Sequence, residues 1–222
     1  MTALSTLSAA ARRKLEAMPS AIITDVFLRL HLNGWMEGIH PVRPDSHMVG
    51  RARTLRFGPV RGVEKPAQSI YAFIRSLQPG DVLVIGADRT TDNVLGGNIA
   101  TCAQEFGLAG IVTDSRNRDF DEMEALSMPV FSAGPATRPP VNVELADFDV
   151  PVSCADTQVK PGDVLIGDRD GVVVIAAAKL EAVLYQADDV VAVEKELGAA
   201  VKAQAPLDVI HGLLARKKTL RA

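Results

Sequence analysis

The apolar residues near the N-terminus recur at helical spacing in two segments. This spacing predicts a first helix over residues 5–17, which Ser5 or Thr6 can cap. A second helix is predicted from Ser20, its N-cap, to Asn33-Gly34, where the asparagine–glycine pair can end it. The chain is therefore expected to begin with two amphipathic helices.

The middle of the chain alternates short apolar runs with segments of helical period. Apolar and polar residues alternate over residues 49–57, which predicts a half-buried strand, and residues 66–77 return to helical spacing. The order strand, helix, strand, helix, strand then follows at residues 82–85, 97–106, 109–113, 119–126 and 129–132. This order predicts parallel strands joined by crossover helices, and it places the chain in the α/β class.

The last third of the chain begins with an irregular segment. Residues 134–149 are rich in proline and polar side chains, which predicts a loop. Strands are then predicted at residues 150–154, 163–166 and 172–175, followed by a long helix over 177–199 and a short one over 206–216. No segment has the composition of a linker, so we expect a single domain over residues 1–222.

Composition and charge exclude several classes of function. The 222 residues carry a net charge of −3, so the basic surface that attracts nucleic acids or anionic membranes is missing. No apolar run approaches the roughly 20 residues of a membrane helix, and the N-terminus lacks a signal-peptide pattern. Cys102 and Cys154 cannot form a disulfide framework. We therefore expect a cytoplasmic protein that binds neither nucleic acid nor membrane.

A pair of glycines stands at the start of the predicted helix 97–106. In Gly96-Gly97-Asn98-Ile99 the glycines allow close approach of a ligand to the backbone. The free N–H groups at a helix N-terminus favour an anion such as a small carboxylate. A simple turn before the helix explains the same glycines, so this motif alone leaves both interpretations open.

A second group of candidate residues follows the predicted strand 109–113. Asp119 and Glu122 are three residues apart, so a helix that starts here places both carboxylates on one face. Two hard oxygen ligands with room for water suit Mg²⁺ or Mn²⁺, and Arg118 offers a planar fork for a carboxylate or keto oxygen. Alternatively, the acids simply favour a helix N-terminus and Arg118 is their solvated partner.

Taken together, the two groups resemble a motif of the RraA-like family. Gly97, twenty further residues, Arg118-Asp119, two residues and Glu122 are similar to the family pattern Gly-x20-Arg-Asp-x2-Glu/Asp. Six other segments also resemble the family, and the likeness extends over residues 18–200. These segments are residues 21–25, 50–54, 110–114, 129–131, 161–164 and 167–172.

This resemblance implies a swivelling β/β/α fold with N-terminal helices and a C-terminal helical tail. It further implies a homotrimer, or a hexamer of two trimers, with active sites between subunits. The implied activity is that of a divalent-metal-dependent class II aldolase, a lyase that cleaves a 4-hydroxy-2-oxo acid such as 4-hydroxy-4-methyl-2-oxoglutarate. The products would be pyruvate and a second carbonyl compound, with oxaloacetate decarboxylation as a side activity. The family also includes the regulator of ribonuclease E activity A, so the alternative is a non-catalytic protein that binds a ribonuclease.

The resemblance also implies roles for the candidate residues. Asp119 would bind Mg²⁺ or Mn²⁺ directly, and Glu122 would act through a metal-bound water. Arg118 would hold the pyruvyl part of the substrate and stabilise its enolate. Other aldolases of the family carry an acid where Gly97 stands, so Glu122 would take over that role in the metal shell.

Two further parts of the site are implied in the same way. The backbone N–H groups around Gly96, Gly97, Asn98 and Ile99 would hold the substrate carboxylate. An acidic residue from the C-terminal helix of a neighbouring subunit would complete the site, and the candidates are Glu194 and Glu196.

Overall fold

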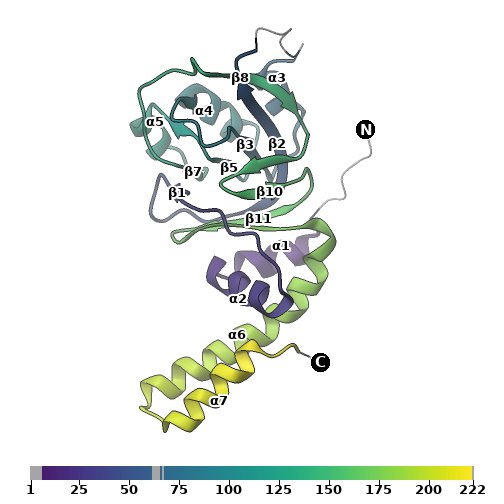
Figure 1. Cartoon of the computed structure of the whole chain (residues 1–222), viewed down its shortest axis with the longest axis vertical. Helices are drawn as coiled ribbons and strands as arrows, with labels where there is room; N and C mark the ends of the chain where they lie inside the picture. The colour runs from purple at the N-terminus through teal and green to yellow at the C-terminus, as the bar shows by residue number, and fades with distance from the viewer. Residues whose placement is uncertain (1–6, 62–65, 67, 222) are drawn as a thin grey trace.

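The computed structural model describes residues 7–61, 66 and 68–221, and its strands gather at one end of the molecule (Figure 1). Two N-terminal helices, α1 (Ala9–Glu16) and α2 (Ser20–Leu30), lie beside this sheet region. The C-terminal helices α6 (Leu180–Lys202) and α7 (Leu207–Lys218) form a hairpin that extends away from it. None of the helices in the described residues combines the length and the apolarity that a membrane crossing needs.

An eight-stranded sheet forms the centre of the fold. In spatial order its strands are β1 (His40–Pro41), β7 (Val130–Ser132), β5 (Gly110–Thr113), β3 (Asp81–Gly86), β2 (Met48–Pro59), β11 (Val164–Asp168) and β12 (Gly171–Ile175), with β8 (Val143–Phe148) also paired to β2. The strands β2, β3, β5 and β7 run parallel to one another, which confirms the predicted parallel core.

Three short helices connect the parallel strands. They are α3 (Ile70–Ser76), α4 (Gly97–Glu105) and α5 (Phe120–Glu124), and each lies within a predicted helical segment. Ala100 and Ala103 of α4 are fully buried in the same apolar cluster as Leu83 and Ile111 of the sheet. The small alanine side chains allow α4 to lie close to the strands, which brings its first residues to the edge of the sheet.

The strand β8 corrects the prediction that residues 134–149 form a loop. It pairs antiparallel with residues 55–59 of β2, beyond the part of β2 that pairs with β11. Because β2 is twelve residues long, one of its edges accommodates two strands in succession. The prolines that indicated a loop precede the strand, at residues 135, 139 and 140.

The expected half-burial of β2 is also wrong. Its first eight residues are all buried, including Arg51 and Arg53. The Arg51 guanidinium lies 3.2 Å from Asp81, and Arg53 forms an ion pair with Asp149. Since these carboxylates neutralise the arginines inside the protein, polar positions in the alternating pattern did not mark a solvent-exposed face.

The N-terminal helices begin close to the predicted positions but are capped differently. Ser8 caps α1 by accepting a hydrogen bond from the Ala11 amide, and the predicted caps Ser5 and Thr6 lie outside the described residues. The residue that precedes α2 is Pro19, so Ser20 is not its cap. The Ser20 amide and hydroxyl instead donate to Asp168 at 2.6 and 2.8 Å, which ties α2 to the β11–β12 hairpin.

The second helix also ends earlier than predicted. Its C-cap is His31, which adopts a left-handed conformation with φ 51°, and the following amide of Leu32 returns to the Phe27 carbonyl. Gly34 has a different role, because its carbonyl accepts from the Val174 amide of β12. A Cβ at this position would lie 2.3 Å from the Val174 carbonyl oxygen, so only glycine allows this approach.

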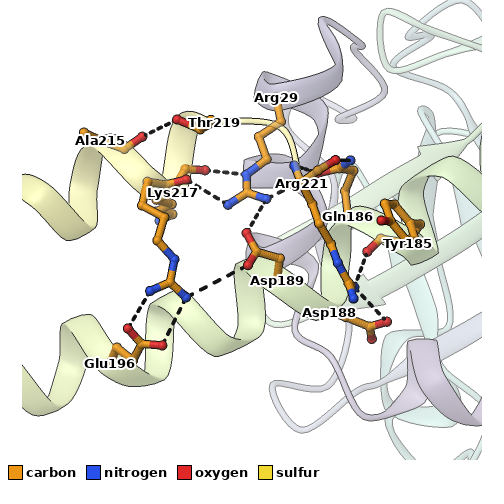
Figure 2. Close-up of polar contacts among 11 residues, drawn as sticks. Arg29, Tyr185, Gln186, Asp188, Asp189, Glu196, Ala215, Lys217, Thr219 and Arg221 are labelled. Carbon is orange, nitrogen blue, oxygen red and sulfur yellow. Dashed lines mark hydrogen bonds and ion pairs between the residues drawn. The ribbon is translucent and has the colours of Figure 1, made fainter.

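The C-terminal helices confirm the predicted long and short helical segments. They pack against each other and against α2 through a buried arginine (Figure 2). The Arg29 side chain is fully buried, and its Nη1 lies 2.9 Å from Asp189 of α6. Its Nε and Nη2 donate to the carbonyls of Lys217 and Arg216 at 2.5 and 3.1 Å. The Arg216 carbonyl also accepts from the Thr219 amide, and the arginine adds a cation at the negative end of the α7 dipole.

We predict that Arg29→Met lowers the free energy of unfolding by about 3 kcal/mol, because Asp189 loses its nearer cationic partner and the Lys217 and Arg216 carbonyls lose a charged donor. Urea unfolding measures the change. The matched control is Arg56→Gln, since Arg56 forms an exposed ion pair with Asp147 and should contribute less than about 1 kcal/mol. Equal effects of the two substitutions would contradict a supporting role for the buried arginine.

Candidate functional site

A pair of short parallel strands brings the glycine motif and the arginine–aspartate motif together. β4 (Asn93–Leu95) ends directly before Gly96, and β6 (Arg116–Asn117) ends directly before Arg118. The two strands pair in parallel, and the Arg118 amide donates to the Leu95 carbonyl at 3.0 Å. Two motifs that are about twenty residues apart in sequence therefore leave the same sheet edge side by side.

Asp119 connects the two motifs directly. Its Oδ2 accepts a hydrogen bond of 2.9 Å from the Gly97 amide, the first amide of α4. Asp119 is itself the N-cap residue of α5, with a left-handed backbone at φ 60°. This conformation, which aspartate adopts more readily than most residues, turns its carboxylate toward α4 instead of its own helix. The negative charge thus lies at the positive end of the α4 dipole.

Glu122 lies on the same side of the site as Asp119. A Cβ built on Gly97 would lie 2.1 Å from Glu122 Oε2 and 3.2 Å from the Asp119 Cβ. Both acidic side chains therefore surround one small volume, which is open only because residue 97 is glycine. The predicted convergence of Asp119 and Glu122 is present in the structure, and Gly97 provides the space for it.

Arg118 extends next to this pair. Its Nε lies 3.7 Å from Asp119 Oδ2, and 54% of its side chain is exposed. Asp119 is 40% exposed, so both charged groups are accessible to a small molecule. An arginine in this position offers several N–H donors to a planar anion while its contact with Asp119 holds it beside the carboxylates.

The amides of the glycine motif are partly engaged within the chain. Gly97 donates to Asp119, and Ile99 donates to the Gly96 carbonyl at 3.1 Å. Asn98 is exposed, and as one of the first residues of α4 its amide has no acceptor within the helix. The predicted carboxylate site at these amides stays a prediction, with Asn98 as its most accessible donor.

Asp92, which the sequence reasoning missed, fixes one side of the site. It is buried and accepts from the amides of Val141 and Asn142 and from Arg138 Nε, at 3.0, 2.8 and 2.9 Å. The Asn142 amide contributes most to holding the Asp92 pKa below its usual value. This carboxylate thereby ties the chain before β8 to the residue that precedes β4. No sequence motif surrounds Asp92 that could have indicated this role.

Asn117 supports the site from beneath. It lies between Arg116 and Arg118 but is fully buried, and its amide oxygen accepts from the Ser132 hydroxyl at 2.6 Å. Its Nδ2 lies 3.1 Å from the Met123 sulfur of α5. These contacts position β6 on the core. The alternation of residues in Ser115-Arg116-Asn117-Arg118 was the sequence signal that could have indicated the burial of Asn117.

Glu194 and Glu196 are not near these residues in one chain. They lie on α6, whereas α4 and α5 are at the opposite end of the molecule (Figure 1). Glu194 pairs with Lys217 at 2.5 Å. Glu196 pairs with Arg216 at 2.7 Å (Figure 2). Their predicted contribution requires a second subunit and stays a prediction.

The donor set at the site is small. Within residues 7–61, 66 and 68–221, no three or more histidine, cysteine, aspartate or glutamate side chains form a cluster that could hold a metal ion. Asp119 and Glu122 are a pair of carboxylates, which leaves most coordination positions of a divalent ion to water, substrate or another subunit. Mg²⁺ commonly binds proteins in this manner, through one or two carboxylates and retained waters.

The mixed α/β fold is that of a known class of proteins. A family model named RraA-like, described as Aldolase/RraA, matches residues 20–174. The chain belongs to the RraA-like family. The match includes the whole candidate site of α4 and α5 and excludes the C-terminal hairpin.

Relatives and solved structures agree with this assignment. A protein of Halalkalibacterium halodurans, provisionally named a 4-hydroxy-4-methyl-2-oxoglutarate aldolase, is 31% identical over 67% of this chain and 69% of its own length. A 4-hydroxy-4-methyl-2-oxoglutarate aldolase of Thermus thermophilus is 27% identical over 59% of this chain and 76% of its own.

The structural similarity extends further along the chain. Streptomyces coelicolor RraAS2, described as an unusual member of the RNase ES inhibitor RraA family, has a TM-score of 0.76 and 28% identity, and the match covers 83% of this chain and 93% of that chain. An uncharacterized protein from Pseudomonas syringae pv. tomato has a TM-score of 0.81 with 23% identity, covering 93% of this chain and 99% of that one, which shows a shared fold.

We predict that Gly97→Ala destabilises the protein by about 1–3 kcal/mol, because the new methyl group overlaps Glu122 Oε2. In a Glu122→Ala background the same substitution should cost much less, and a double-mutant cycle in urea measures this coupling. Gly198→Ala on α6 is the matched control, since nothing lies within 4 Å of its new Cβ and the helix should gain about 0.5–1 kcal/mol. Additive effects in the cycle would show that Glu122 does not occupy this volume.

Proposed function

We propose that this protein is a divalent-metal-dependent aldolase that cleaves a 4-hydroxy-2-oxo acid, such as 4-hydroxy-4-methyl-2-oxoglutarate, and releases pyruvate. The observation that supports this most is the convergence of Asp119 and Glu122 at Gly97 beside the exposed Arg118. The names of several relatives support the same substrate class. Oxaloacetate decarboxylation is the proposed side activity.

The two carboxylates fit a hard divalent ion. Asp119 would bind Mg²⁺ or Mn²⁺ directly, and Glu122, which shares the space at Gly97 with it, would act through water, as the family resemblance implies. When bound, the ion would supply a Lewis acid for the 2-keto and carboxylate oxygens of the substrate.

Arg118 provides the electrostatic part of the reaction. In the cleavage, a water acting as base accepts the 4-hydroxyl proton, a carbonyl forms at C4 as the C3–C4 bond breaks, and the bonding electron pair moves toward the 2-keto oxygen to form the enolate of pyruvate. The guanidinium of Arg118 would stabilise the negative charge that develops on this oxygen. Return of the proton from that water to C3 completes the reaction. Decarboxylation of oxaloacetate yields CO₂ and passes through the same enolate, so it requires no additional residue.

The proposed assembly is a homotrimer or a dimer of trimers, in which the α6–α7 hairpin of one subunit reaches the site of the next. Glu194 and Glu196 are the acidic residues that this hairpin could contribute. Both already pair with basic residues of α7, so either would approach the neighbouring site together with its counter-ion or exchange that partner.

A second candidate function is that of a non-catalytic regulator that binds a ribonuclease. Its support is the similarity to Streptomyces coelicolor RraAS2, which is described as a member of a family of ribonuclease inhibitors. A protein that only binds a ribonuclease has no need for two carboxylates that converge on a glycine next to an accessible arginine. For this reason we favour the lyase.

We predict that purified protein releases pyruvate from 4-hydroxy-4-methyl-2-oxoglutarate with Mg²⁺ or Mn²⁺ and that a chelator abolishes the activity. Asp119→Asn and Arg118→Gln should each lower kcat/KM by roughly 100-fold or more, since each removes a charge that stabilises the transition state. Asp121→Asn is the matched control, because Asp121 is an exposed acid of the same helix and lies outside the site.

The outcomes separate the two candidate functions. Turnover that survives both site substitutions would contradict the assigned roles. No turnover of this substrate or of oxaloacetate, together with inhibition of a ribonuclease by the purified protein, would establish the regulator instead.

A further inference from the structure

A second arginine faces the same side of the site as Arg118. Arg116 is two residues earlier on β6, and side chains two apart in a strand point to the same face. Asn117 between them is fully buried against the core, so its neighbours on either side face away from the core. The pairing with β4 continues to the Arg118 amide, directly after β6, so the two arginines lie on one side of the same extended segment.

A glycine in the adjoining loop makes room for the Arg116 side chain. Arg116 Nη1 donates to the Ala133 carbonyl at 2.5 Å. A Cβ on Gly134 would lie 3.1 Å from this nitrogen, and Gly134 has a φ of 106°, which disfavours any residue with a side chain. The loop is itself joined to β6, because the Asn117 amide donates to the Gly134 carbonyl at 3.1 Å. The guanidinium is thus held by a loop that is itself joined to β6.

Arg116 lacks a carboxylate partner among the described residues, although it is partly buried. Nearby arginines differ in this respect, since Arg138 pairs with Asp92 and Arg118 lies near Asp119. One hydrogen bond to a carbonyl uses a single donor of the five that a guanidinium carries. A partly buried cation without counter-charge is costly, and an anionic ligand would offset this cost.

The spacing of the two arginines suits a substrate with two carboxylates. Residues two apart in a strand are separated by roughly 7 Å. The two carboxylate carbons of an extended five-carbon dicarboxylic acid are about 5 Å apart, given bonds of about 1.5 Å. Hydrogen bonds from the long arginine side chains accommodate this difference.

We propose that Arg116 determines substrate specificity by binding the second carboxylate of a 2-oxo dicarboxylic acid, while Arg118 binds its 2-oxo acid end. The inference rests on the proposed function for the identity of the reacting end. Because the second carboxylate is attached to C4 and keeps the same charge throughout the cleavage, Arg116 contributes about equally to the ground state and the transition state. Its loss therefore raises KM and leaves kcat nearly unchanged.

The kinetic test compares two substrates that differ only at the group in question. They are 4-hydroxy-4-methyl-2-oxoglutarate and 4-hydroxy-4-methyl-2-oxopentanoate, in which a methyl group replaces the second carboxylate. Arg116→Gln should lower kcat/KM for the dicarboxylate by roughly 10- to 100-fold, mainly through KM, and leave the monocarboxylate within about twofold. Arg116→Lys keeps the positive charge and should retain part of the preference.

Arg138→Gln is the matched control, because the charge of Arg138 is already paired with the buried Asp92. It should leave the ratio between the two substrates unchanged. Equal losses on both substrates with Arg116→Gln, or a lost preference with Arg138→Gln alone, would overturn the assignment. Thermal unfolding of each variant separates a loss of binding from a loss of structure.

A binding experiment tests Arg116 independently of turnover. Calorimetry in the presence of Mg²⁺ compares 2-oxoglutarate with 2-oxopentanoate, which again exchanges a carboxylate for a methyl group. Tighter binding of 2-oxoglutarate that disappears in Arg116→Gln supports the inference even if no substrate is cleaved, in which case only the proposed reaction fails. Equal binding of the two ligands, no binding of either, or a preference that survives the substitution overturns the inference.

Discussion

The parallel pairing of β4 with β6 is the constraint on which the site depends. Each strand is only two or three residues long, yet each ends directly before a chemically important motif. The hydrogen bond from the Arg118 amide to the Leu95 carbonyl aligns the ends of the two strands. The Asp119 carboxylate then closes the arrangement by accepting from the Gly97 amide. Asn117 anchors β6 to the core and Asp92 anchors the residues before β4, so the pairing is supported from both sides.

The electrostatic character of the site follows from how its charges are compensated. Asp119 lies at the N-terminus of α4 and near Arg118, so its charge is favoured by both. The Glu122 carboxylate can lie next to residue 97 because glycine has no side chain there. Asp92 is buried, but backbone amides and Arg138 satisfy it, which makes it a structural anion. Asp119 is a candidate metal ligand because its carboxylate is partly exposed to solvent. Asp92 is buried with its hydrogen bonds satisfied, so its role is structural.

The sequence predicted most of the elements because their periodicity reflects how each one packs. The parallel order of β3, β5 and β7 and the grouping of Arg118, Asp119 and Glu122 could be inferred in this way. The strand β8 could not, since its partly buried residues follow prolines and pair with a strand that is distant in sequence. The burial of Arg51 and Arg53 depends on Asp81 and Asp149, and pairing between distant charges leaves no local signal. Asp92 was missed for the same reason, because Val141 and Asn142 are 49 and 50 residues away.

The buried Arg29 has a mechanical consequence for the C-terminal hairpin. It holds the last turn of α7 and the Asp189 carboxylate of α6 at one point, while Ser20 at the other end of α2 is bound to Asp168 of the β11–β12 hairpin. The α6–α7 hairpin therefore cannot swing about a free joint at its base. The hairpin is therefore rigidly attached, and a force applied at its tip is transmitted through α2 to the central sheet. A partner that binds the α6–α7 hairpin is thereby held at a fixed orientation relative to the sheet.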